Sequence, residues 1–480
     1  MAATRCYDNL GCYESSILHA LPQEPTHLRT RYTVSCRGHV DDAVIFATDG
    51  KTAMKSKIEK SCFSVDKPIK LLTHGFNGKG TAAWVLSMRD AFLAKEDCNV
   101  VVVDWHHGAT YPYEQAVANS LLVARQVGNF IRHLELVHGV PPLTVHLIGH
   151  SIGAHISGNA GAAVAPSRVA RVSGLDPAEP YFDRLDDSLR LDPSDAIFVD
   201  VIHTDAETFT GLKGYGSVRR QGHVDFYPNG GVRQPGCISP SDLANLLPDT
   251  ATYSRSGIAC SHSRALYLFI ESLNSHSGED IGKSSGSNTT GTSSVTGSCS
   301  MSDAADCQSW EDFESGNCKS CPGKACLLMG YYADKFPAAR GSIYLSTTSN
   351  APFCGKDYLV SVQVSPDQGH AFGRLILVLE NNTSLLEILD FSRADRHYRS
   401  LRTETHVMTI AASVGDALTL DAVFLPGSGL SSLGTTSSLS IERVDVTDLA
   451  DSNNRWSFCR SDGQVLQAGD DGSKQTLTIC

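Results

Sequence analysis

The sequence lacks any long apolar segment. No run of eighteen apolar residues occurs among its 480 positions, so no stretch is long enough to cross a bilayer as a helix. The opening residues, 1–6, also contain no apolar stretch of the kind that forms a secretion signal. We therefore expect either a cytosolic protein or a mature form whose leader has been removed.

The sequence also lacks an excess of basic residues. Its 52 Asp and Glu outnumber its 40 Lys and Arg, which gives a formal net charge of -12. This balance argues against nucleic acid as a partner and leaves the substrate class open. No internal repeat is visible, and the length predicts two domains, each able to bury a core.

Cysteine, in contrast, is abundant, with 15 residues. Several lie at short spacings: Cys6/Cys12, Cys307/Cys318 and Cys321/Cys326. This usage favours an oxidising compartment, and therefore secretion. A zinc site at the Cys-x-x-Cys pair of Cys318 and Cys321 is the alternative, but no second pair with zinc-like spacing follows. The odd count leaves at least one thiol free or bonded to another molecule.

The most informative stretch surrounds Ser151. An apolar run over 143–148 ends at Gly149, and a helical pattern begins after Gly153. A sharp turn at Ser151 requires strained backbone angles and leaves no room for side chains two residues to either side. The pattern predicts a strand, a tight turn and a helix, with the hydroxyl at the carboxyl end of a sheet. Taken alone, this five-residue pattern is equally typical of a plain loop.

Apolar strands alternate with helical patterns through the first 270 positions. We predict buried strands at 69–73, 99–105, 143–148, 169–175 and 196–202, edge strands at 31–34 and 43–47, and helices at 82–94, 113–136 and 264–273. This alternation predicts an α/β fold with a mostly parallel, doubly wound sheet.

The composition changes after Arg340. Short alternating runs at 358–364, 374–379 and 417–424 predict an antiparallel β-sandwich. We therefore expect a first domain at 1–340 and a second at 341–480. The Ser/Gly/Thr-rich stretch at about 275–302 predicts a flexible surface insertion. Three asparagines head Asn-x-Ser/Thr triplets and would be glycosylated only if exposed and secreted: Asn288, Asn381 and Asn382.

Three residues have the chain order of a catalytic triad. A serine hydroxyl needs a base to take its proton, and the base needs an acid to orient it. Ser151, Asp176 and His262 follow the order expected when the serine lies in an α/β-hydrolase sheet. Asp176 before Pro177 could instead form a turn, and His262 could cap the next helix. Together, the three positions favour the catalytic interpretation.

An oxyanion hole needs two backbone N–H groups aimed at one point. The residue after the predicted nucleophile, Ile152, is one candidate, and Phe76 in the glycine-rich segment after the first buried strand is the other. We interpret His74, His150 and His155 as packing or hydrogen-bonding residues.

Several segments together resemble the pancreatic lipase family. They are His74-Gly75-Phe76, Val103-Asp104-Trp105, Gly149-His150-Ser151-Ile152-Gly153-Ala154-His155, Gly174-Leu175-Asp176-Pro177-Ala178-Glu179-Pro180, 222–231 and Cys260-Ser261-His262. The likeness covers nearly all of residues 1–340. It implies an α/β-hydrolase domain followed by a lipoxygenase-like (PLAT-type) β-sandwich, matched mainly by position and by 329–334. By position, Ser151 resembles the nucleophile, Asp176 the acid and His262 the base, with Phe76 and Ile152 as oxyanion donors.

The resemblance also implies a structural calcium ion on the loop 187–195. Side-chain oxygens would come from Asp192 and Asp195, and backbone carbonyls from Asp187 and Arg190. The family pattern has Glu where this chain has Asp187, which a backbone ligand tolerates. Oxygen ligands on a short loop suit calcium, although acidic loops without metal are common.

By the same resemblance, disulfides would join Cys6 to Cys12, Cys237 to Cys260, Cys307 to Cys318, Cys321 to Cys326 and Cys459 to Cys480. Five cysteines are left without an expected partner: Cys36, Cys62, Cys98, Cys299 and Cys354.

The surface loops bear on the substrate. The segment 237–260 contains Leu243, Leu246, Leu247 and Ile258 among polar residues, which suits a lid with an apolar underside, although an ordinary surface loop is the alternative. Because this segment and the loop 205–221 are full length, we expect a secreted lipase that acts on triacylglycerol at a lipid surface. The alternatives are a phospholipase A1 or galactolipase, and a non-catalytic lipid-binding relative of the yolk-protein type.

The second domain is expected to bind a lipid surface or a small helper such as colipase. A local basic cluster could meet polyanions, although an exposed charged loop is the simpler interpretation: Arg393, Arg396, Arg399 and Arg402.

Overall fold

The computed structural model describes residues 3–15, 20–206, 214–237, 259–274, 307–318, 327–366, 369–381, 384–392, 395–427, 432, 434–461, 467–469 and 472–480. Several predictions lie outside the described residues. They are the lid apart from its ends, the insertion at 275–302, and those on Asn288, Asn382, Arg393, Cys299, Cys321 and Cys326.

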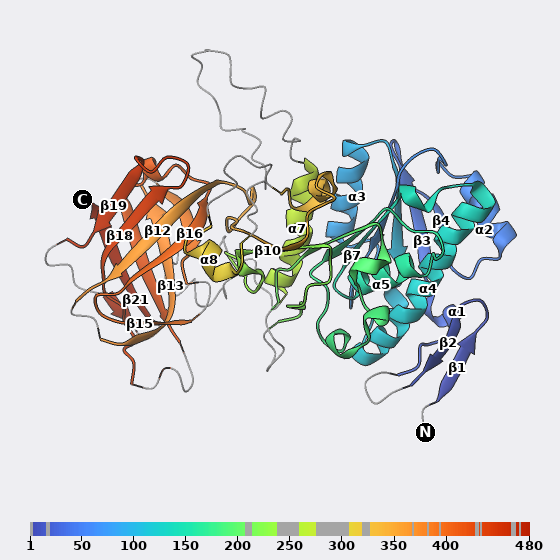
Figure 1. The fold of residues 1–480 in the computed structure, drawn as a ribbon, viewed down its shortest axis with the longest axis horizontal. Helices are drawn as coiled ribbons and strands as arrows, with labels where there is room; N and C mark the ends of the chain where they lie inside the picture. Colours follow the sequence, from blue (N-terminus) through green and yellow to red (C-terminus); the bar gives the residue numbers. More distant parts are fainter. Residues whose placement is uncertain are drawn as a thin grey trace, which may run out of the picture. The chain divides into compact units, whose positions relative to one another are not determined.

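The described residues belong to two compact units (Figure 1). The first unit draws on 1–226, 262–274 and 327–342, and the second on 227–261, 275–326 and 343–480. The division into domains at residue 340 stays a prediction.

A mostly parallel sheet has most of its strands in residues of the first unit. In the described part of the chain it has nine strands, in the order β11 (Gly341–Leu345), β10 (Val224–Pro228), β9 (Phe198–Ile202), β8 (Arg171–Leu175), β7 (Val145–His150), β5 (Ile69–Thr73), β6 (Asn99–Asp104), β3 (Arg31–Cys36) and β4 (His39–Phe46). Strands β10 to β6 are parallel neighbours, whereas β3 is antiparallel to both β6 and β4. The predicted parallel core of the sheet is confirmed.

Helices cover both faces of this sheet. They are α1 (Pro25–Leu28), α2 (Lys51–Glu59), α3 (Ala83–Lys95), α4 (Tyr113–His138), α5 (Ile152–Ala162) and α7 (Cys260–Asn274) (Figure 1). Successive side chains of a strand point to opposite faces. Leu147 of β7 therefore packs in one core with Ile156 of α5, whereas the ring of His146 lies near Phe92 of α3 and Phe269 of α7. This arrangement is the doubly wound α/β fold that the alternating pattern predicted.

An antiparallel sheet organises the second unit. Among the described residues its order is β14 (Leu385–Asp390), β13 (Ala371–Glu380), β17 (Thr419–Pro426), β21 (Gly472–Ile479), β19 (Arg455–Cys459), β18 (Ile441–Asp448), β12 (Lys356–Val364) and β16 (Thr403–Ile410), with β15 (Arg396–Tyr398) on β13 and β20 (Gln467–Gly469) on β21. Alternate residues of β12 are buried, and they share one core with Phe424 and Phe458. Strand alternation around a common core confirms the predicted β-sandwich. The short helix α8 (Trp310–Glu314) precedes these strands in the chain, and the small hairpin of β1 (Thr4–Tyr7) and β2 (Gly11–Glu14) precedes the first sheet.

Four expected disulfides are present: Cys6–Cys12, Cys237–Cys260, Cys307–Cys318 and Cys459–Cys480. Cys354 is also disulfide-bonded. Among the described cysteines, Cys98 is the free thiol, and burial raises its pKa to about 12. A thiol with this pKa is unreactive at neutral pH.

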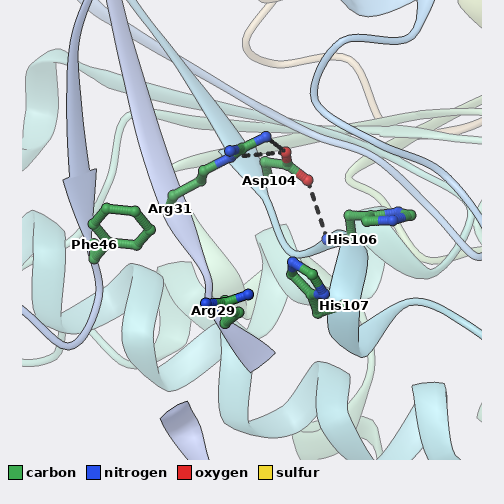
Figure 2. A pocket seen from close by; sticks show the side chains of 6 residues that line it. All are labelled: Arg29, Arg31, Phe46, Asp104, His106 and His107. Carbon is green, nitrogen blue, oxygen red and sulfur yellow. Dashed lines mark hydrogen bonds and ion pairs between the residues drawn. The ribbon is translucent and has the colours of Figure 1, made fainter. Parts of the chain in front are cut away.

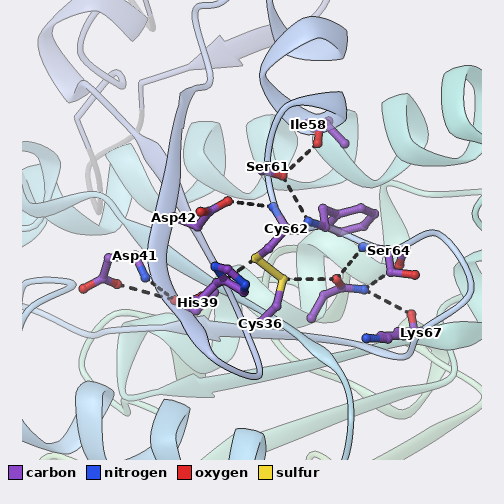
Figure 3. Close-up of a disulfide and its surroundings, with 12 residues drawn as sticks. Cys36, His39, Asp41, Asp42, Ile58, Ser61, Cys62, Ser64 and Lys67 are labelled. Atoms are coloured by element: carbon purple, nitrogen blue, oxygen red, sulfur yellow. Dashed lines mark hydrogen bonds between the residues drawn. A yellow bond between two sulfur atoms is a disulfide. The ribbon is translucent and has the colours of Figure 1, made fainter.

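One further disulfide joins Cys36 to Cys62, two residues that were left without an expected partner (Figure 3). It links β3 to the segment that follows α2. Asp42 accepts a hydrogen bond from the Cys62 amide at 2.6 Å, and Asn99 at the start of β6 accepts one from the Ser64 amide at 2.9 Å. The disulfide and these bonds fix the antiparallel edge of the sheet to its parallel core.

None of the helices in the described part of the chain combines the length and apolarity needed to span a bilayer.

Candidate active site

Ser151 lies in a sharp turn between β7 and α5. Its φ of 58° and ψ of -126° form a strained combination for a non-glycine residue. A Cβ atom on Gly149 would lie 2.0 Å from the Gly153 carbonyl oxygen, and one on Gly153 would lie 2.4 Å from the Thr73 carbonyl oxygen. Both flanking positions therefore require glycine, for the steric reason inferred from the sequence.

Asp176 follows the neighbouring strand β8. The Ser151 amide donates to the Leu175 carbonyl at 3.1 Å, which places the ends of β7 and β8 side by side. The Asp176 carboxylate is completely buried, and its Oδ1 accepts hydrogen bonds from the amides of Thr204 and Asp205 at 2.7 and 3.1 Å. A Cβ atom on Gly216 would lie 2.5 Å from this oxygen. The surrounding backbone therefore holds the carboxylate in one position.

His262 lies in the first turn of α7 and contacts Asp176 directly. Its Nδ1–H donates to Asp176 Oδ2 at 2.6 Å, which leaves Nε2 as the nitrogen able to take a proton from another group. The partners are 86 residues apart in the sequence. Their bond fixes the imidazole tautomer that a serine hydrolase requires.

His150, the residue before Ser151, connects the turn to the helix that carries His262. Its Nε2–H donates to the His262 carbonyl oxygen at 3.0 Å, and the two ring centroids are 4.5 Å apart. Burial, together with the neighbouring His262, keeps the pKa of His150 well below its usual value, so this ring is neutral. The expected hydrogen-bonding role of His150 therefore has a specific partner.

The two expected oxyanion donors belong to segments that adjoin Ser151. Ile152 is the first residue of α5, where backbone N–H groups have no partner within the helix. A Cβ atom on Gly75 would lie 2.6 Å from Ser151 Cβ, so the segment that contains Phe76 passes directly against the serine. The Phe76 ring packs edge-on against Tyr111 and Tyr113, at 4.8 and 4.9 Å between centroids.

His74, which lies in the same segment as Phe76, is held by contacts with Asp104 and Trp105. Its Nε2 lies 3.2 Å from Asp104 Oδ1, and its carbonyl oxygen accepts a bond from the Trp105 indole at 2.8 Å. Arg31 donates two hydrogen bonds to Asp104 Oδ2, at 2.7 and 3.0 Å (Figure 2). Burial alone would raise the pKa of Asp104. Hydrogen bonds with His74 and Arg31 outweigh burial and hold this pKa below its usual value. His74 is therefore a buried hydrogen-bonding residue.

Sequence reasoning missed Asp205 and Gly216. In the described residues, Asp176, Asp205 and His262 form one group whose potential ligand atoms all lie within 4.8 Å of one another. Asp176 and His262 already share a hydrogen bond, and Asp205 Oδ2 accepts one from the Tyr215 amide at 3.0 Å. Asp176 and His262 are therefore bonded to each other, and Asp205 is bonded to the backbone. No motif signalled the two missed residues, because they act through backbone contacts with Asp176.

The loop proposed for calcium carries a buried carboxylate. Asp195 is 3% exposed, and its Oδ2 accepts a bond from the Asp192 amide at 2.9 Å. Burial, helped by the charge of Asp192, raises the pKa of Asp195 to about 8. The side chain of Asp187 is instead paired with the Arg190 guanidinium. Two adjacent carboxylates, one of them costly to ionise, fit a hard divalent cation.

His155 connects this loop to the segment after Asp176. Its Nε2–H donates to the Ala178 carbonyl at 2.9 Å, and its Nδ1 accepts from the Leu191 amide at 3.1 Å. Burial lowers the pKa of His155 to about 3, so the ring is neutral. The structure thus gives His155 a hydrogen-bonding role.

The doubly wound sheet and the strand–serine–helix turn at the end of β7 define an α/β hydrolase fold. The Lipase family model matches residues 41–353. The chain belongs to the pancreatic lipase family.

Three relatives illustrate the match. The chain is 34% identical over 380 residues to inactive pancreatic lipase-related protein 1 of Homo sapiens, and the match covers 75% of this chain and 74% of the relative. It is 33% identical over 375 residues to pancreatic triacylglycerol lipase of Myocastor coypus, covering 75% and 76%. It is 31% identical over 422 residues to pancreatic lipase-related protein 2 of Rattus norvegicus, covering 84% of each.

Proposed function

We propose that the chain is a secreted lipase that hydrolyses triacylglycerol at a lipid–water interface, with Ser151 as nucleophile, His262 as base and Asp176 as acid. The observation that carries the proposal is the 2.6 Å bond between His262 Nδ1 and Asp176 Oδ2, next to the strained turn at Ser151. This bond leaves His262 Nε2 to receive the serine proton.

The proposed reaction has two steps. His262 Nε2 takes the proton of Ser151 Oγ as the oxygen attacks the ester carbonyl, and Asp176 stabilises the resulting imidazolium. The amides of Ile152 and Phe76 donate to the developing oxyanion, a contribution of about 3 kcal/mol for each donor. His262 then protonates the leaving alkoxide, and an acyl group remains on Ser151. Water activated by His262 releases the fatty acid.

The proposed calcium ion has a structural role. Carboxylate oxygens of Asp192 and Asp195, with the carbonyls of Asp187 and Arg190, would hold it. The ion would neutralise the buried Asp195 carboxylate, whose charged form is disfavoured by burial.

Two further parts of the proposal concern location and surface. Five disulfides with both partners described support secretion, because such bonds persist in oxidising compartments. The β-sandwich is proposed to contact the lipid surface, and colipase is the proposed helper.

A second candidate function is non-catalytic lipid binding, because some relatives, including that of Homo sapiens, are named inactive. Labelling with a radioactive organophosphate separates the two functions. We expect one label per chain in the wild type and none in Ser151→Ala, with unchanged circular dichroism. A wild-type chain that takes no label would favour the non-catalytic function.

The substrate is tested with emulsified triolein against phosphatidylcholine, above and below the solubility limit, with and without colipase. We expect faster hydrolysis of triolein, with a rise in rate above the solubility limit. A preference for phosphatidylcholine or a galactolipid would instead support the phospholipase A1 or galactolipase alternative.

A further inference from the structure

A small cavity lies beside the end of β6. None of the side chains that line it takes part in the proposed reaction, although Asp104 contacts His74. The volume of the cavity is about 180 Å³. It is lined by Arg29, Arg31, Phe46, Asp104, His106 and His107 (Figure 2). Four of these six side chains can carry positive charge, and one can carry negative charge.

The negative charge is already neutralised. Asp104 Oδ2 accepts both bonds from Arg31. Asp104 Oδ1 contacts His74 Nε2 at 3.2 Å and accepts a bond from the His106 amide at 3.1 Å. Both carboxylate oxygens are therefore occupied, and a ligand in the cavity meets cationic donors without a competing free carboxylate.

The positive charge of Arg29 is not neutralised by a described residue. The Arg29 guanidinium makes no hydrogen bond or ion pair with any residue that the structure describes. Partial burial and the charges of His106, Arg29 and Arg31 together lower the pKa of His107, even though Asp104 raises it. The basic groups of the cavity outnumber its one carboxylate, which favours an anion over a cation as its ligand.

The cavity also has an apolar wall and a defined location. Phe46 at the end of β4 forms the wall, and its ring is 38% exposed. Because β6 is two strands from β7, the end of β6 lies roughly 10 Å from the end of β7 along the same edge of the sheet. An anion bound here would lie on the edge that carries Ser151.

We propose that this cavity binds a phosphate group, supplied by the headgroup of a phospholipid at the lipid surface. Arg29 provides the free cationic donor, His107 provides a neutral imidazole N–H, Arg31 provides its remaining N–H groups, and Phe46 contacts the organic part of the headgroup. Guanidinium groups and an imidazole N–H suit the several oxygens of a phosphate. Free inorganic phosphate shares this chemistry, so the experiment separates the two sources.

The experiment measures binding without catalysis, in the full chain carrying Ser151→Ala. Its outcome therefore does not depend on the proposed lipase activity. Arg29→Asn removes the guanidinium at a position with φ of 49°, a left-handed conformation that Asn tolerates. His107→Gln removes the imidazole. Arg125→Gln is the matched control, since Arg125 is an exposed arginine of the same unit outside the cavity.

Two titrations are compared: inorganic phosphate by calorimetry, and vesicles of phosphatidylglycerol with phosphatidylcholine by co-sedimentation. We expect the double variant Arg29→Asn/His107→Gln to bind both about tenfold more weakly, while Arg125→Gln binds like its parent. If the double variant bound phosphate more weakly but bound vesicles like its parent, the cavity would be a site for free phosphate, and the proposed phospholipid headgroup would be wrong. Equal binding by the double variant and its parent in both titrations would overturn the proposal, as would equal losses in the Arg125→Gln control.

Discussion

The two sheets of this chain use their strands in different ways. In the parallel sheet, β5, β6, β8 and β9 are buried at every residue. In the β-sandwich, β12 and β18 bury alternate residues and present the others outward. A strand covered on both faces can present reactive groups only at its end. The proposed nucleophile and acid, Ser151 and Asp176, therefore follow strand ends in the first sheet, whereas β12 and β18 of the sandwich present polar groups along their length.

The sharpest test of this contrast compares two serines. Ser151 follows the end of β7, whereas Ser361 lies within β12, where its hydroxyl contacts that of Thr405 at 2.9 Å. We expect Ser151→Ala to lower the initial rate on a soluble p-nitrophenyl ester by about 10⁵-fold or more, because the nucleophile is lost. Ser361→Ala is expected to leave this rate unchanged. A Ser151→Ala rate within tenfold of the wild type would contradict the assignment.

The second test compares two carboxylates. Asp176→Asn keeps the shape of the side chain but cannot orient His262, and we expect a loss of about 10³ to 10⁴-fold in rate. Asp445 of β18 forms ion pairs with Arg443 and Arg455 on the sandwich, and Asp445→Asn should not change the rate. Rates of both variants are measured over pH 5–9, alongside thermal unfolding. Equal effects of the two substitutions would break the comparison.

A third test asks whether hydrolysis depends on the core of the first unit but not on the core of the second. Leu71 of β5 and Leu377 of β13 are both fully buried. Each substitution by Ala should lower the free energy of unfolding by about 3 kcal/mol. We expect only Leu71→Ala to lower the temperature at which hydrolysis of the soluble ester is lost. Calorimetry and rate measurements on one preparation check this, and inactivation of Leu377→Ala at the same reduced temperature would show that the units unfold together.

The smallest expected effect concerns Asp195 and calcium. Its pKa is raised from 3.8 to about 8, so without metal its contribution to stability is complete below about pH 4 and is lost as the pH rises through about 8. A bound cation would remove this loss. We therefore expect EDTA to lower the melting temperature of the first unit by about 5 °C at pH 8 and by less at pH 5.

Asp195→Asn serves as the control for this effect. It should abolish the pH dependence of the EDTA effect, because residue 195 no longer titrates. The transition of the β-sandwich should not respond to EDTA. An EDTA effect that is equal at both pH values in the wild type would argue against Asp195 as a ligand.

The features that the sequence predicts correctly are those that depend on residues close together in the chain. The strand, turn and helix at Ser151 follow from residues within ten positions of one another, so the sequence predicts them directly. The proposed partners Asp176 and His262 could be chosen from chain order and strand ends. The pairing of Arg31 with Asp104 could not, because it depends on the register between the antiparallel neighbours β3 and β6. The same holds for Cys36 and Cys62, whose bond depends on how the β3–β4 hairpin meets the end of α2.

Backbone support for the acid was also beyond the sequence. Thr204, Asp205 and Gly216 contact Asp176 through amides or through the absence of a side chain. Such contacts place almost no demand on residue type, apart from the glycine. Sequence reasoning therefore selected the side chains that we propose to react and missed the backbone that positions Asp176.

The bond between Cys237 and Cys260 lies close in the sequence to the proposed catalytic base. Cys260 begins α7, and His262 comes two residues later. Reduction of this bond would remove a covalent anchor from the start of the helix, and we expect the imidazole that bonds Asp176 to move more freely in the reduced chain. For the proposed secreted lipase, the expected consequence is an imidazole that becomes fixed only after the chain reaches an oxidising environment.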